Sequence, residues 1–204
     1  SDVCSSDLEI ETKLNVLKKY IDVLKTNPED WPYVQQLLNS LEQANPNNAA
    51  TYTIISDFKY QRKDIKSARQ YIYKSLELEK DKIQVWNRLI VIDSELQDWK
   101  AMVKDGEAAL ELFPSNPGFY YFLGVAYFQD KKYDEAIEVL ETGKLMIFQN
   151  ENGIVDFQIL LADAYNNIGS YKKSDENYDK VLENQPDNDY VLNNYSYYLS
   201  LRKD

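Results

Sequence analysis

The sequence contains no histidine and a single cysteine, Cys4, among its 204 residues. One cysteine can form neither an intramolecular disulfide nor a thiolate metal site. Without histidine the chain lacks the commonest general base and metal ligand. Carboxylate pairs such as Glu135 and Glu138 are present, but their spacing is typical of solvated helix faces. We therefore expect no catalytic residues, no metal and no cofactor, and hence no enzymatic activity.

Basic residues and long apolar runs are also scarce. Lysine and arginine total 23 against 34 acidic residues, which gives a formal net charge of −11. The basic stripe that nucleic-acid binding requires is missing from the sequence. No apolar segment approaches the ~20 residues needed to span a bilayer, so we expect no direct membrane insertion. The low cysteine content suits the cytoplasm and the periplasm alike, which leaves the compartment open.

Aromatic residues, by contrast, recur at a fixed spacing. Tyr52, Trp86 and Tyr120 lie 34 residues apart. An aliphatic residue follows each of them three positions later: Ile55, Leu89 and Leu123. The pattern resumes after one step of 38 residues and again after a further 34. A period of this length is typical of helical-repeat solenoids.

Small residues keep the same period in the second half of each unit. Two series of small to medium residues keep this period, and the second follows the first by seven residues: Ala68, Met102, Ala136 and Ser174, then Ser75, Ala109, Gly143 and Val181. Small side chains that face each other let two antiparallel helices approach to ~8 Å, while larger neighbours fill the grooves beside them. The spacing therefore predicts antiparallel helix hairpins that stack side by side.

These positions resemble the pattern of the tetratricopeptide repeat family, of bacterial type, in which an aromatic residue is followed by Leu-Gly, Tyr, Ala and a closing Pro. The best match is Tyr120, Leu123, Gly124, Tyr127, Ala136 and Leu140, and Pro114 and Pro186 close their repeats. Lys80, Ile90, Met102 and Gln158 depart from the pattern. The resemblance implies an all-α fold, a right-handed α-α superhelix or α-solenoid of about eleven antiparallel helices in stacked hairpins.

The repeat register also divides the chain. Residues 1–8, SDVCSSDL, are similar to a translated sequencing adapter. We expect this segment to be an artefact or disordered, with the native N-terminus and any signal peptide missing. We expect a degenerate helix pair over 9–48, repeats over 49–82, 83–116, 117–154 and 155–188, and the first helix of a truncated repeat over 189–204. The repeat over 117–154 carries a four-residue insertion between Gly143 and Gly153, which predicts a second helix about one turn longer.

In the resembled family, the first helix of each repeat lines the inside of a groove that takes extended peptides or partner helices. Carried over by register, the inward positions predict a partner-binding groove of aromatic, aliphatic and amide side chains: Tyr60, Asn87, Val91, Tyr121, Val125, Phe128, Ile159 and Asn166. Rigid aromatics give contact area at low entropic cost, and asparagine can pair with a peptide backbone. Packing inside the solenoid is the alternative interpretation of Tyr121, Val125 and Phe128.

The sequence thus predicts a non-catalytic protein–protein interaction scaffold that binds a peptide, helix or subunit of unknown identity in its groove. The alternative is a regulatory or substrate-docking segment of a longer protein, with a catalytic or DNA-binding domain outside this chain. A receptor for chaperone C-terminal tails is not expected. Such receptors resemble one another in clamping a carboxylate with Lys, Arg and Asn at inward positions, where this chain has Thr53, Asp57, Tyr121 and Asp163.

Overall fold

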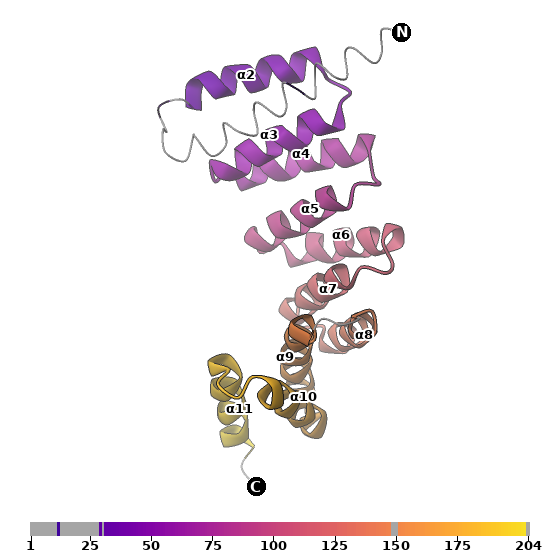
Figure 1. Ribbon diagram of the computed structural model, residues 1–204, viewed down its shortest axis with the longest axis vertical. Coiled ribbons are helices and arrows are strands. Elements are labelled where there is room, and N and C mark those ends of the chain that lie inside the picture. Colours follow the sequence, from indigo (N-terminus) through magenta and orange to yellow (C-terminus); the bar gives the residue numbers. More distant parts are fainter. Residues whose placement is uncertain (1–11, 13–28, 30, 148–150, 203–204) are drawn as a thin grey trace. The chain divides into compact units, whose positions relative to one another are not determined.

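The computed structural model describes Thr12, Glu29 and residues 31–147 and 151–202. Within these ranges the chain forms ten helices and no strand (Figure 1). They are α2 (Trp31–Ala44), α3 (Ala49–Gln61), α4 (Ile65–Leu78), α5 (Ile83–Glu95), α6 (Trp99–Leu112), α7 (Pro117–Gln129), α8 (Tyr133–Lys144), α9 (Glu151–Asn167), α10 (Tyr171–Asn184) and α11 (Asp189–Leu201). The segment 1–8, and all of 9–28 except Thr12, lie outside the described residues. The predicted all-α fold is confirmed.

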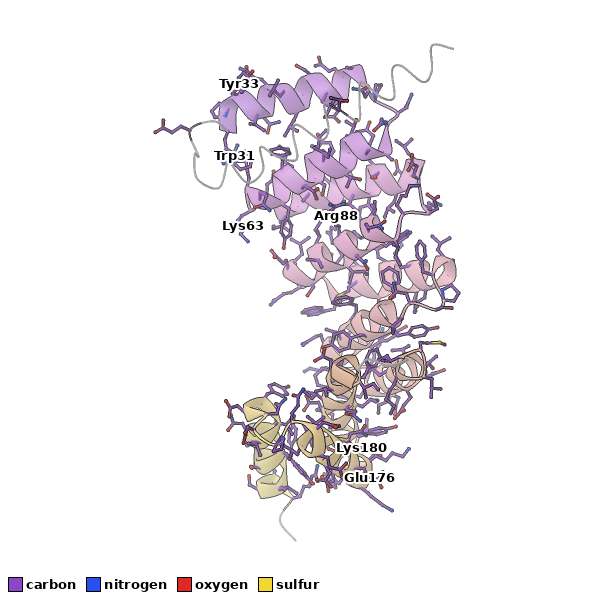
Figure 2. The ribbon with its side chains drawn as sticks, viewed as in Figure 1. Trp31, Tyr33, Lys63, Arg88, Glu176 and Lys180 are labelled. Atoms are coloured by element: carbon purple, nitrogen blue, oxygen red, sulfur yellow. The ribbon has the colours of Figure 1, made fainter. Side chains whose placement is uncertain are left out.

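The helices fall into two compact units, Ser1–Gln97 and Asp98–Asp204. The boundary lies between α5 and α6, inside the expected 83–116 repeat. In the first unit α3 packs against α4 and α4 against α5. Trp31, labelled in Figure 2 at the start of α2, meets Phe58 of α3 edge-on with ring centroids 6.1 Å apart. In the second unit each helix from α6 to α11 packs against the next, and α7 also contacts α9. This pattern is that of hairpins stacked in chain order.

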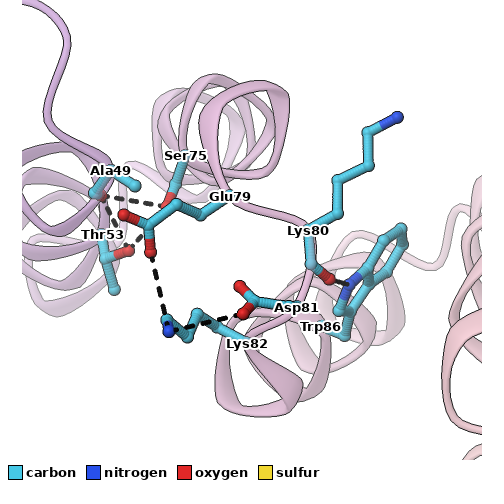
Figure 3. Close-up of polar contacts among 8 residues, drawn as sticks. All are labelled: Ala49, Thr53, Ser75, Glu79, Lys80, Asp81, Lys82 and Trp86. Carbon is cyan, nitrogen blue, oxygen red and sulfur yellow. Dashed lines mark hydrogen bonds and ion pairs between the residues drawn. The ribbon is translucent and has the colours of Figure 1, made fainter.

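The aromatic residue that opens three of the repeats makes the same hydrogen bond in each. Trp86 Nε1 donates to the Lys80 carbonyl at 2.8 Å (Figure 3). The hydroxyls of Tyr52 and Tyr120 donate to the carbonyls of Pro46 and Pro114. All three bonds reach back six residues. Lys80 stands where the family has proline, yet the bond persists because any residue supplies a carbonyl.

The turn inside each repeat also has one recurring feature. Lys63, Gln97, Lys131 and Gly169 adopt positive φ angles of 61°, 52°, 61° and 76°. A left-handed residue at the end of a helix lets the chain reverse and satisfies its last carbonyls. Three of the four are not glycine, and the left-handed region costs a residue other than glycine ~1–2 kcal/mol. Packing of the hairpin therefore imposes the turn against local preference.

The insertion does not lengthen the second helix of its repeat, so that expectation is wrong. α8 ends at Lys144. The next residue, Leu145, is 72% exposed and so is not part of the core. Instead α9 begins at Glu151 and runs for 17 residues, whereas α3, α5 and α7 each have 13. The inserted residues thus extend the start of the next first helix. Residues 148–150 lie outside the described ranges.

Small residues at the helix contacts are buried, as their period predicts. Ala68, Ser75, Ala109 and Ala136 are fully buried. A Cβ atom at Gly143 would lie 2.3 Å from the Cβ of Tyr120 and 2.8 Å from Cε1 of Phe157. Those two residues belong to α7 and α9, so α8 approaches both helices at this point. Only hydrogen fits there, because real Cβ atoms do not approach carbon so closely.

We predict that Gly143→Ala lowers the free energy of unfolding by about 1–3 kcal/mol, because the added methyl overpacks the contact. Alanine would otherwise favour a helix over glycine by about 1 kcal/mol. Urea unfolding followed by circular dichroism measures the difference. Gly118→Ala is the control, since its Cβ would meet only the side-chain oxygen of Asn116 at 3.1 Å. An equal loss in both variants would contradict the close-contact explanation.

Candidate functional site

The three predicted groove residues of the first unit lie together. Tyr60 from α3 and Asn87 and Val91 from α5 line one pocket of about 300 Å³. Its remaining lining residues are Ser56, Asp57, Arg88 and Ile92. Val91 is 42% exposed although it is aliphatic. The pocket therefore presents apolar surface to solvent between two helices, with polar groups beside it.

Tyr60 lines this pocket, and its hydroxyl is bound by a residue that does not line it. Its hydroxyl donates a hydrogen bond to the carboxylate of Glu95 on α5. That bond, together with burial and the negative charge of Glu95, raises the pKa of Tyr60 to about 12. The phenol therefore remains protonated at neutral pH. Because its hydroxyl is already engaged, Tyr60 offers a ligand mainly the face of its ring.

A second pocket of about 250 Å³ adjoins the first, and Asp57 and Arg88 line both. Its other lining residues are Ala49, Ala50, Thr53, Ile54, Ser75, Glu79, Lys82, Gln84 and Val85. The hydroxyls of Thr53 and Ser75 are 2.9 Å apart and both donate to the carbonyl of Ala49 (Figure 3). These hydroxyls are thus satisfied within the protein.

An ion pair separates the two pockets. Arg88 Nε lies 2.9 Å from Oδ1 of Asp57, joining α5 to α3. The two side chains are 41% and 21% exposed. Arg88 is not among the residues predicted from the sequence, although it lies one helical turn before Val91 on the same face. The groove therefore does contain a cation, and Asp57 neutralises it.

The predicted residues of the second unit do not gather in one place. Tyr121 lines a pocket of about 450 Å³ with Pro117, Gly118, Met146, Ile147, Gly153, Asp156 and Phe157. Its ring centroid lies 5.4 Å from that of Phe157. Burial and, to a smaller extent, the charge of Asp156 raise the pKa of Tyr121. This pocket includes Met146 and Ile147, which lie in the segment of the insertion.

The other four have neighbours inside the unit. Phe128 packs against the cluster around Leu140, and its ring lies 5.4 Å from that of Tyr133. Ile159 packs against the cluster that contains Val155, Ala162, Tyr178, Val181 and Val191. Val125 is half-buried on α7, and Asn166 accepts a hydrogen bond of 2.8 Å from Nη2 of Arg202. Packing is therefore a sufficient role for Phe128 and Ile159.

Asp163, an inward position by register, is a core residue with 3% exposure. Its carboxylate accepts hydrogen bonds from the hydroxyls of Tyr178 and, at 2.9 Å, Tyr190. Tyr198 and Asn194 also hydrogen-bond to it. Loss of solvation in this buried site raises the pKa of Asp163, although the hydrogen bonds oppose the shift. The cluster attaches α11 to α9 and α10.

In the described part of the chain no helix is long and apolar enough to cross a membrane. The same residues hold no group of three or more potential metal ligands. What the fold and the grooves define is a helical-repeat scaffold for protein interactions.

Comparison with known proteins identifies the repeat. The family model of the tetratricopeptide repeat matches residues 117–144 and 155–188. The crystal structure of YrrB, titled a tetratricopeptide-repeat protein with an unusual peptide-binding site, is 16% identical with a TM-score of 0.69, covering 96% of this chain and 98% of that one. The crystal structure of MamA protein is 19% identical with a TM-score of 0.68, covering 83% of this chain and 90% of that one. MamA from Desulfovibrio magneticus RS-1 is 17% identical with a TM-score of 0.67, covering 87% of this chain and 97% of that one.

No curated protein matches the sequence. At these identities the solved structures show the fold alone, and the repeat model identifies two segments of the chain. Residues 117–144 and 155–188 are tetratricopeptide repeats, as the sequence pattern indicated, and proteins or peptides are the partners that this class of fold generally takes.

We predict that Asp163→Ala destabilises the protein by about 1–3 kcal/mol, because it leaves the buried hydroxyl of Tyr178 without its acceptor. Asp163→Asn keeps an acceptor oxygen and removes the charge. The pKa of Asp163 lies above its ordinary value of 3.8. Its contribution to stability is therefore full below that value and is lost as the pH rises through the folded-state pKa.

The stability of Asp163→Asn relative to the parent chain should consequently increase as the pH is raised from the ordinary carboxyl pKa of 3.8 through the raised pKa of the folded state. Urea unfolding of both proteins across that range tests the trend. Asp187→Asn, at an exposed position, changes the net charge equally and should give a flat difference. A flat difference for Asp163→Asn as well would show that the carboxyl has no raised pKa.

Proposed function

We propose that this chain is a non-catalytic scaffold that binds an extended segment of a partner protein between α3 and α5. The observation that supports this most directly is the gathering of Tyr60, Asn87 and Val91 around one open pocket. Their positions follow from the repeat register, so the site is a product of the fold and not of an isolated loop. Tetratricopeptide repeat proteins are generally interaction scaffolds.

The size of the pocket favours side chains of a polypeptide over a cofactor. At about 300 Å³ it is at the lower limit of small-molecule sites, which range over ~300–1,000 Å³. Val91 and Ile92 supply apolar contact, and the exposed amide of Asn87 can donate to and accept from a peptide backbone. The structure of YrrB, whose title reports a peptide-binding site, gives the fold a precedent for such a ligand.

We expect a phage-displayed library of 12-residue peptides, selected on the purified chain, to yield binders that fluorescence anisotropy can measure. Val91→Asp should weaken them at least tenfold, because it places a charge in the apolar contact. Circular dichroism should be unchanged, since Val91 is 42% exposed.

Leu112→Asp is the matched control. Leu112 is 45% exposed, belongs to α6 and lines neither pocket. Peptide affinity should therefore be the same as for the parent chain. A library that yields no binder, or equal weakening by the two substitutions, would overturn the groove assignment.

A further inference from the structure

Arg88 lies between the two pockets of the first unit with much of its hydrogen-bonding capacity unused. A guanidinium carries five N–H donors in a planar fork. The ion pair with Asp57 engages the Nε side at 2.9 Å. A single carboxylate takes at most one edge of that fork, and the Arg88 side chain is 41% exposed. Donors of the other edge therefore remain for a ligand, at a residue that lines both pockets.

The charge of the pair determines which acceptor suits these donors. Asp57 already balances the charge of Arg88, and its side chain is only 21% exposed. A ligand carboxylate would bring a second anion beside Asp57, where like charges repel. A backbone carbonyl accepts the same hydrogen bonds without adding charge. The neutral pair thus favours the main chain of a peptide over an acidic group.

The two adjoining pockets, which share Asp57 and Arg88, can each take one side chain of an extended peptide. In such a chain alternate side chains point the same way and lie ~6.5–7 Å apart. The first pocket is lined by Tyr60, Val91 and Ile92. The second contains Lys82, whose Nζ is 4.0 Å from Glu79 and 3.6 Å from Asp81 and so remains able to donate hydrogen bonds (Figure 3). The two pockets therefore suit different side chains.

We propose that Arg88 donates hydrogen bonds through Nη1 and Nη2 to a backbone carbonyl of the bound peptide. An apolar side chain of the peptide enters the pocket at Val91, and a polar side chain two residues away enters the pocket at Lys82. Arg88 thereby fixes the register of the peptide across the groove. This inference rests on the proposed function, because it assigns the chemistry of the ligand at that same site.

An amide-to-ester scan tests the proposal. The probe is the peptide most enriched by the library selection, synthesised with blocked termini and with each backbone amide replaced in turn by an ester, whose carbonyl is a weaker acceptor. On the parent chain, one ester position between the two anchor side chains should weaken binding about fivefold. Arg88→Gln should weaken the all-amide peptide about tenfold and abolish the effect of that ester.

Two further variants separate charge from geometry. Arg88→Lys keeps the charge without the planar fork, so it should lose the ester effect as well. Asp57→Asn removes the balancing anion, so it should bind the free-acid form of the peptide several-fold better than the amide form, whereas the parent chain should not. Thermal unfolding of each variant checks that the helices remain folded.

The outcomes distinguish this inference from the function on which it depends. An identical ester profile on the parent chain and Arg88→Gln would overturn the role of Arg88 while leaving peptide binding intact. A preference of the parent chain for the free acid would overturn the neutral-acceptor argument. If the library yields no binder at all, that result contradicts both the proposed function and this inference.

Discussion

The approach of one helix to the next is limited by the side chains between them, and the rest of the molecule depends on that limit. Gly143 has no room for a methyl between Tyr120 and Phe157, and a Cβ at Gly124 would lie 2.5 Å from Cγ of Leu140. Buried alanines and serines occupy the corresponding contacts elsewhere. Because the hairpins α3–α4 and α7–α8 close on small residues at the same offsets, their first helices present equivalent faces. The groove of the first unit is the surface that this regularity leaves open.

The charge of the chain is unevenly distributed with respect to that groove. Residues 98–204 contain 10 basic and 19 acidic residues, so they hold −9 of the net −11. The first unit is close to neutral, and its two pockets contain the ion pair of Arg88 and Asp57 together with Lys82 and Glu79. Electrostatic steering by net charge is therefore weak there. The binding proposed for the first unit would depend instead on hydrogen bonds and on the shape of two small pockets.

The repeat period predicted the hairpins and the positions of Tyr60, Asn87 and Val91, because the 34-residue register runs unbroken from Tyr52 to Tyr120. Beyond Gly143 the inserted residues extend the start of α9. From there on the repeat register alone no longer predicts which side chains are exposed to solvent. Asp163 illustrates this limit. Its burial depends on hydroxyls from α10 and α11, and no local pattern reveals a pairing across 15 and 27 residues.

Arg88 shows a second limit of sequence patterns. Helical spacing places it on the same face as Val91, but its pairing with Asp57 depends on the side-chain conformations of two different repeats. The pattern could indicate that a cation lies near the groove; it could not show that the cation is already balanced. That difference decides between a carboxylate and a carbonyl as ligand.

The aromatic residues that close the loops have a practical consequence. Trp31 and Trp86 belong to the first unit and only Trp99 to the second, whereas 11 of the 17 tyrosines lie in residues 98–204. The indole of Trp86 is 93% shielded and bonded to the Lys80 carbonyl, so its emission changes when that loop opens. Tryptophan fluorescence therefore follows mainly the melting of one half of the molecule, while tyrosine absorbance follows mainly the other. A single sample observed in both channels can show whether the halves lose structure in one step or in two.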